Sequence, residues 1–364
     1  MNNKTLKLDR LSFLISSLLF FLLCIGMIAA PSAANKGTSD GIESCMNVLV
    51  PSLFPFMFLS SFTVLYGISQ RLGRLFSKIT TGLFALPSEA GVTILLSLVG
   101  GFPVGAIGIN SLYKHNVITD KQARRMLFFC VNSGPGFLIS VVGSQLYGSS
   151  QLGLILTAVQ TSVSILTGIV LGVLSKKKEP LVTKDYSNRD HMSFSDAFVC
   201  SCKAACKSMA MLCSMVVLFS CFTELAEYFV RFGHDSPTGI IVRCICEVTD
   251  GCTALADNRL PVYLAALCAG FGGLCVHFQI FAAVTDIKIN KLTFFFSRIV
   301  SGVLCSGVTY LICRVLSISA DVFSNIEEAS FQTSSVTYFG SAALMISVIS
   351  FLICTSGIFP KSKA

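Results

Sequence analysis

The stretch that decides the fold is LVGGFPVGA, residues 98–106, which lies inside an apolar run at about 91–113. Its Gly-Gly-Phe-Pro core holds no strong helix former, and Pro103 removes a backbone donor from any helix there. A second interruption, NSGPG at residues 132–136, divides the apolar run at about 126–148. Unpaired backbone groups are costly in hydrocarbon, so such breaks are tolerated only against protein or a polar cavity. Both breaks therefore predict an interior site.

The composition indicates a membrane protein. The 364 residues are 53% hydrophobic and only 13% charged, which is too little charge to cover a soluble domain of this length. The net charge of +8 lies at the ends of apolar runs and forms no basic stripe, so we expect a lipid bilayer and no nucleic acid as partner. The fold class is therefore all-α and polytopic, with further apolar segments at about 11–30, 45–67, 151–174, 208–230, 261–284, 292–316 and 335–356.

Three blocks of the first half recur in the same order in the second half. Their offsets grow by small steps, as loop insertions would produce. The pairs are 59–65 with 219–225 (219 − 59 = 160), 78–86 with 247–255 (247 − 78 = 169) and 98–106 with 270–278 (270 − 98 = 172).

A duplication of this kind predicts two inverted repeats with re-entrant or broken helices. If each short Thr-Gly piece and the Gly-rich segment after it form a hairpin, each half has an odd number of spans and the halves are inverted. Under this topology Lys114, Lys121, Arg124 and Arg125 face the cytoplasm, which agrees with the positive-inside rule. The second half agrees less well, because four of its basic residues would face outside: Arg231, Arg243, Lys288 and Lys291.

The first apolar segment is either a retained helix or a cleaved signal peptide, since small residues follow it. Its length exceeds the roughly 7–15 residues of a signal core, which favours retention. We expect an N-terminal transmembrane helix with an external linker (1–43), a first repeat (44–175), a cytoplasmic hydrophilic linker (176–203), a second repeat (204–357) and a short tail (358–364).

The breaks and their counterparts are the predicted solute-binding residues. Free N–H groups at a broken helix attract anions, and neutral Asn and Ser donors suit carboxylates. The alternative is that the glycines only permit close helix packing. In the first half the candidates are Gly100, Gly101, Pro103, Gly105, Asn132, Ser133 and Gly134.

The second half supplies the other candidates. Glu247 either binds a coupling cation, a proton or the solute, or forms a salt bridge with Arg243 one turn earlier. His277 is either a packed, hydrogen-bonded residue or a proton relay. The full set is Glu247, Thr249, Gly251, Gly272, Gly273, His277 and Gln279.

Nothing in the sequence predicts catalysis, a metal or another cofactor. The four histidines sit in no motif with catalytic spacing, and no GxxxxGK[ST] loop is present. Most of the 16 cysteines lie in apolar runs, and the cluster Cys200, Cys202 and Cys206 matches no zinc spacing.

Several of these segments resemble the nucleoside-recognition, or Gate, domain family, and within it the sporulation integral membrane proteins. The resemblance rests on residues 48–60, 97–106, 118–126, 129–143, 247–251 and 272–279. It implies a protein of endospore formers, placed in the outer forespore membrane, that moves dipicolinic acid toward the spore. Dipicolinate is a small planar dianion and fits the predicted anion site.

Two other functions stay open at this stage. One is a nucleoside or nucleobase permease, and the other is a spore-envelope assembly factor that transports nothing. The sequence leaves the coupling ion, the direction of flux and homo-oligomer formation undecided.

Overall fold

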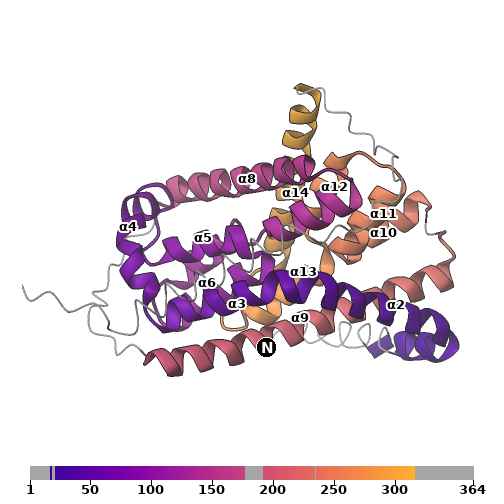
Figure 1. Ribbon diagram of the computed structural model, residues 1–364, viewed down its shortest axis with the longest axis horizontal. Helices are drawn as coiled ribbons and strands as arrows, with labels where there is room; N and C mark the ends of the chain where they lie inside the picture. Colours follow the sequence, from indigo (N-terminus) through magenta and orange to yellow (C-terminus); the bar gives the residue numbers. More distant parts are fainter. Residues whose placement is uncertain (1–16, 19–20, 177–191, 234, 316–364) are drawn as a thin grey trace, which may run out of the picture. The chain divides into compact units, whose positions relative to one another are not determined.

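The computed structural model describes residues 17–18, 21–176, 192–233 and 235–315, and the regular structure within these ranges is entirely helical. The predicted all-α class is therefore confirmed. In chain order the elements are α2 (Pro31–Ser44), η1 (Cys45–Leu49), α3 (Val50–Leu65), α4 (Ile68–Leu83), α5 (Ala90–Gly100), α6 (Phe102–Lys114), α7 (Asp120–Leu127), η2 (Gly136–Leu146), α8 (Ser150–Lys176), α9 (Phe194–Val230), α10 (Pro237–Cys246), α11 (Val248–Asp257), α12 (Val262–Phe271), α13 (Gly273–Ala283) and α14 (Lys291–Val315), with η marking π-helical turns (Figure 1).

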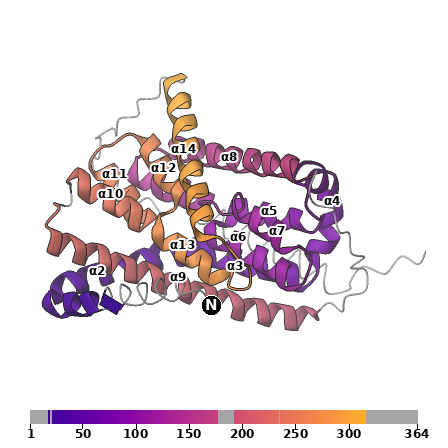
Figure 2. The ribbon, with the colours of Figure 1, turned by 180° about the vertical axis from the view of Figure 1, so that it is seen from behind.

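Four helical segments in the described ranges are long and apolar enough to cross a membrane: α8, α9, α12 with α13, and α14. A fifth is the pair formed by residues 31–49 and 53–65, which is bent by 59°. The chain is therefore a polytopic membrane protein, as predicted. Figure 2 shows α14 packed against α12.

The predicted break at Gly101 is the tip of a helical hairpin made by α5 and α6. A Cβ added at Gly108 would lie 2.7 Å from Thr93 Cγ2, and one added at Gly105 would lie 3.1 Å from Ser97 Cβ. These contacts pair residues at equal distances from the tip, so the two helices run antiparallel. Gly101 makes the turn with φ +84°, a conformation that L residues rarely adopt.

A second hairpin, made by α10 and α11, turns at Glu247. This residue is extended (φ −144°, ψ 135°) between the two helices. A Cβ added at Gly251 would lie 2.6 Å from Cys244 Cα, so these helices also pack antiparallel. Each hairpin is followed by a broken helix and then a long helix. In the first half the broken helix is α7 and η2, interrupted at residues 129–135, and the long helix is α8. In the second half the broken helix is α12 and α13, interrupted at Gly272, and the long helix is α14.

The two halves have the same order of elements, but this order pairs their segments differently from the sequence offsets. The sequence offsets align residues 98–106 with residues 270–278, that is, a hairpin tip with a broken helix. The element order instead pairs Gly101 with Glu247, an offset of 247 − 101 = 146. The predicted register is therefore corrected. The register from the sequence was wrong because it aligned glycines with glycines, whereas the second hairpin turns at a glutamate.

The two hairpins open toward opposite ends of α9. The base of the first hairpin lies at Lys114, which lines one cavity together with Lys207 from the first half of α9. Lys114 also pairs with Asp286 at 3.0 Å. We call this the lysine end. The second hairpin is held by Arg243, which pairs with Glu224 near the end of α9 at 3.1 Å. We call this the carboxylate end.

The lysine end corrects part of the predicted topology. Asp286 follows α13 and pairs with Lys114, so Lys288 and Lys291 lie close in sequence to a residue at the lysine end. The prediction that they face the side opposite to Lys114 is therefore wrong, because α12 and α13 are long enough to cross as one broken span.

Two predicted boundaries also change. The expected external linker before residue 44 is helix α2, and the hydrophilic linker ends earlier than expected because α9 begins at Phe194. Residues 1–16, 177–191 and 316–364, with most of the hydrophilic linker, the segment at 335–356 and the tail, lie outside the described residues.

Candidate functional site

Each hairpin tip touches the broken helix that follows it. A Cβ added at Gly134 would lie 3.2 Å from Gly101 N, so the first tip lies against the first break. A Cβ added at Gly273 would lie 3.2 Å from Glu247 Cα, so the second tip lies against the second break. Gly272 and Gly273 both have positive φ, +87° and +72°, which explains why glycine occupies them.

The two halves also touch each other at these breaks. A Cβ added at Gly272 would lie 3.2 Å from the Phe102 ring, and Ser133 Oγ donates to Ala269 O at 3.1 Å. All four interruptions of the helices therefore meet at one place, although they are spread over residues 100–273.

A small cavity of about 40 Å³ lies at this meeting point, and we call it the inner cavity. Leu53 of α3 and Leu212 and Val216 of α9 form part of its apolar wall. Its volume suits a water molecule or two and no organic solute, so the site is closed in this conformation. Half of the predicted residues line it: Gly101, Pro103, Ser133, Gly134, Glu247, Thr249 and Gln279.

Helix N-termini surround the inner cavity. The first turns of α6, η2 and α11 supply Phe102, Phe137 and Val248 to its lining, and α13 supplies Val276. The first N–H groups of a helix have no intrahelical acceptor and carry partial positive charge. One terminus is already neutralised, because Glu247 Oε2 accepts from Asp250 N at 2.8 Å. The remaining termini favour an anion.

A larger cavity of about 350 Å³, the outer cavity, opens beside the inner one. Pro103, Leu212 and Gln279 line both cavities and therefore form the constriction between them. The outer cavity carries Lys114 and Lys207, and no carboxylate is among its lining residues. It is large enough for a small solute, and Lys207 adds a positive charge beside Lys114, which is paired with Asp286.

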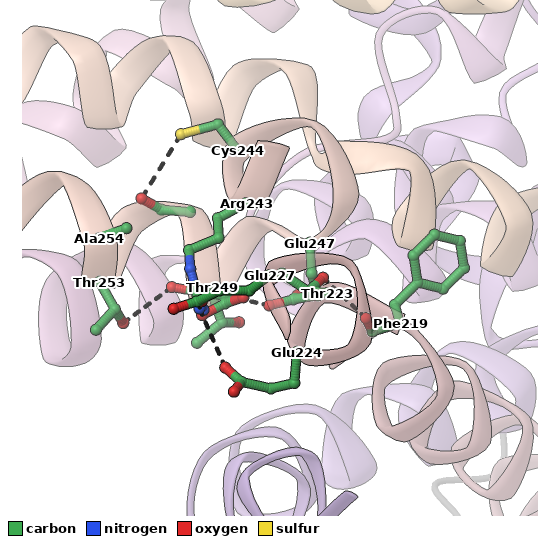
Figure 3. A network of polar contacts seen from close by, with 12 residues as sticks. Phe219, Thr223, Glu224, Glu227, Arg243, Cys244, Glu247, Thr249, Thr253 and Ala254 are labelled. Atoms are coloured by element: carbon green, nitrogen blue, oxygen red, sulfur yellow. Dashed lines mark hydrogen bonds and ion pairs between the residues drawn. The ribbon is translucent and has the colours of Figure 1, made fainter. Parts of the chain in front are cut away.

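The carboxylate end holds an ion-pair network (Figure 3). Arg243 is 2% exposed and binds Asp250 at 2.7 Å, Glu224 at 3.1 Å and Glu227. Lys36 of α2 binds the other oxygen of Glu224 at 2.9 Å. The alternative that Arg243 pairs with Glu247 is wrong, because the Glu247 carboxylate binds the start of α11 instead.

Other predicted residues have packing roles. Asn132 donates to Phe129 O at 2.7 Å and accepts from Ser164 Oγ at 2.6 Å, so its amide does not line either cavity. His277 packs among Phe271, Phe294 and Phe295. The glycines of this group make close contacts with neighbouring segments: Gly100 with Val104, Gly105 with Cys130, Gly251 with Cys244, Gly272 with Phe102 and Gly273 with Glu247.

Sequence reasoning missed Arg298 of α14. This arginine is 1% exposed, and its guanidinium lies 5.9 Å from the centre of the Phe102 ring, which lines the inner cavity. The available signal was an arginine inside the apolar run 292–316, since ionisable residues within a membrane span are costly and usually functional.

Comparison with curated proteins identifies one relative. The chain is similar to a sporulation integral membrane protein, YlbJ of Bacillus subtilis (strain 168). The two are 21% identical over 351 aligned positions, which cover 85% of each chain. This confirms the predicted resemblance to the YlbJ group. No family model matches the chain, so the Gate domain stays a prediction. No solved structure matches it either.

Proposed function

We propose that the chain is an integral membrane transporter of a small polar or anionic solute, with dipicolinate as the best-fitting candidate. The observation that carries the proposal is the convergence of four helix interruptions on one cavity between two similarly ordered halves. Secondary transporters place their sites at such broken helices, because the exposed backbone groups bind the solute.

Helix N-termini and a lysine of the outer cavity support an anion. Lys207 lines the outer cavity beside Lys114, which pairs with Asp286. The N-termini of α6, η2 and α13 favour negative charge in the inner cavity, where the Glu247 carboxylate already caps α11. Dipicolinate carries two carboxylates on a flat ring, and the aromatic side chains of Phe102 and Phe137 offer apolar surface beside those N-termini.

The arrangement also supports alternating access. Basic residues gather at the lysine end, so the positive-inside rule assigns this end to the cytoplasm. The outer cavity then opens to the cytoplasm, and the Arg243 network holds the second hairpin to α9 at the carboxylate end. Rearrangement of the two hairpins would close one access and open the other.

The resemblance to a sporulation integral membrane protein supports a membrane role in endospore formation. The proposal places the chain in the outer forespore membrane. The test is to delete the gene from its spore-forming host, leave dipicolinate synthesis intact, and measure dipicolinate in purified spores. The proposal expects a large loss that the wild-type gene restores. Normal spore dipicolinate in a host without a second copy would refute it.

Two further measurements separate the alternatives. Uptake of labelled uridine by the chain in a host without nucleoside transporters would favour a nucleoside or nucleobase permease. A spore-envelope assembly factor would instead tolerate substitutions that fill the inner cavity, such as Ser133→Val, while its deletion would still disturb the envelope.

A further inference from the structure

Arg298 is a buried cation that has no counter-ion among the described residues. It is 1% exposed, and among the described residues no carboxylate lies within ion-pair distance of it. Its Nη2 donates to Gly270 O in the last turn of α12, whereas its Nη1 is buried and has no hydrogen-bond partner. Burial of an unpaired charge is expensive in a protein and more so in a membrane span, so a compensating anion is expected.

The position of Arg298 links it to the inner cavity. The guanidinium lies over the Phe102 ring at 5.9 Å from its centre, and the same ring is part of the cavity lining. Phe102 is also the first residue of α6, directly after the hairpin tip at Gly101. A movement of that tip would therefore move the ring that lies between the guanidinium and the cavity.

The other buried arginines have more partners, although Arg243 Nε, like Arg298 Nη1, is buried without a hydrogen-bond partner among the described residues. Arg243 is compensated by three carboxylates, and Arg125 donates to Phe84 O, Ala85 O and Ser175 Oγ. Each of these two guanidinium groups therefore contacts three oxygen-bearing groups. Among the described residues Arg298 contacts one carbonyl, and its Nη1 has no hydrogen-bond partner.

We propose that Arg298 is the carboxylate-binding residue of the inner cavity, with Phe102 as the side chain that covers it in the closed conformation. The inference rests on the proposed transport function and names the chemical class of the solute as carboxylate-bearing. A guanidinium can hold a carboxylate through two parallel hydrogen bonds, which sets it apart from the helix N-termini nearby.

The test measures binding to the purified full-length chain in lipid nanodiscs. The probes are pyridine-2,6-dicarboxylate and its neutral analogue pyridine-2,6-dicarboxamide. The variants are Arg298→Gln, which can still donate to Gly270 O, and Arg314→Gln, which removes an exposed arginine from the same helix. We expect Arg298→Gln to weaken dicarboxylate binding by about 10- to 100-fold, as loss of a charged hydrogen-bond partner does, and to leave diamide binding unchanged. Arg314→Gln should match the wild type.

The outcomes separate this inference from the proposed function. Wild-type dicarboxylate affinity in a folded Arg298→Gln variant would overturn the role of Arg298 and leave transport standing. Binding of another carboxylate, but not of the pyridine dicarboxylate, would overturn the dipicolinate proposal, and loss of that binding in the variant would keep the role of Arg298. A wild-type chain that binds no anion would overturn both.

If Arg298→Gln does not fold, a second variant provides the test. Arg298→Lys keeps the charge and one donor for Gly270 O but cannot form two parallel bonds to a carboxylate. We then expect weaker dicarboxylate binding and unchanged diamide binding. Equal affinity of Arg298→Lys and wild type for the dicarboxylate would overturn the proposal.

Discussion

Gly134 and Gly101 lie in backbone contact, although one belongs to a broken helix and the other to a hairpin tip. A Cβ added at Gly134 would lie 3.2 Å from Gly101 N and 3.3 Å from Val99 O. Both neighbours are backbone atoms, which cannot rotate away as a side chain could. The first hairpin therefore fits against the first break only because no side chain separates them.

Gly134→Ala should impair transport more than it impairs folding. The added methyl must push the hairpin tip away by a few tenths of an ångström, and such overpacking costs about 1–3 kcal/mol of unfolding free energy. We expect solute binding at the inner cavity to be lost, because the tip residues Gly101 and Pro103 line it. Binding to purified protein and its thermal unfolding would measure the two effects separately.

Gly307 offers a matched control in α14. A Cβ added there meets nothing within 4 Å, so Gly307→Ala should stabilise the helix by about 0.5–1 kcal/mol and leave binding unchanged. If Gly134→Ala bound the solute with the same affinity as Gly307→Ala, the contact between the tip and the break would have no functional role.

The positions of the helix breaks could be predicted from the sequence, but their arrangement in space could not. Glycine and proline act on the local backbone, so the breaks at Gly101 and at residues 132–136 could be read from residue type alone. The hairpin tip at Glu247 has no such local signal, because its carboxylate supplies the N-cap of α11 through a bond to Asp250 N. The pairing of hairpin with hairpin is a tertiary feature, and glycine matching led to the wrong register.

Asn132→Ala should lower the stability of the protein rather than the affinity of its site. The Asn132 amide links Phe129 O to Ser164 Oγ, and its loss leaves two buried groups without this partner. A buried unsatisfied group costs about 1–3 kcal/mol, so we expect reduced membrane abundance and a lower unfolding temperature. The protein that still folds should bind the solute like the wild type.

Ser164→Ala provides the partner for a double-mutant cycle. The combined variant should cost less than the sum of the two single variants, because each removes the same hydrogen bond. A selective loss of affinity in Asn132→Ala at normal stability would restore Asn132 to the solute site predicted from sequence.

Arg243→Met should destabilise the protein far more than Lys36→Met. Both side chains bind Glu224, but Arg243 is 3% exposed at its side chain and Lys36 is 59% exposed. Removal of one partner from a buried ion pair costs about 3–5 kcal/mol, because the remaining charges stay buried. A mostly exposed pair contributes about 0–1 kcal/mol. Unfolding in detergent would measure both, and similar losses would show that the network is solvated rather than dry.

The partners of buried charged residues could not be predicted from the sequence alone. Arg243 and Arg298 are both arginines in or near apolar segments, and the sequence does not tell which of them has a carboxylate partner. The fold brings Glu224 and Glu227, which lie 19 and 16 residues earlier in the chain, onto Arg243. In the part of the chain that the structure describes, it places no carboxylate at Arg298.

Glu247→Gln should separate the two roles that the Glu247 carboxylate combines. Its oxygen caps α11 through Asp250 N and also lines the inner cavity. The glutamine oxygen can accept the same hydrogen bond, so the fold should survive, whereas Glu247→Ala should lose about 1 kcal/mol with the cap. If the charge of Glu247 holds a coupling proton or cation, proteoliposomes containing Glu247→Gln should transport pyridine-2,6-dicarboxylate without responding to an imposed pH or sodium gradient. Asp257→Asn, at an exposed position of the same helix, should keep the wild-type response. A Glu247→Gln variant with wild-type rate and wild-type gradient dependence would reduce Glu247 to a helix cap, and the coupling site would then have to lie elsewhere.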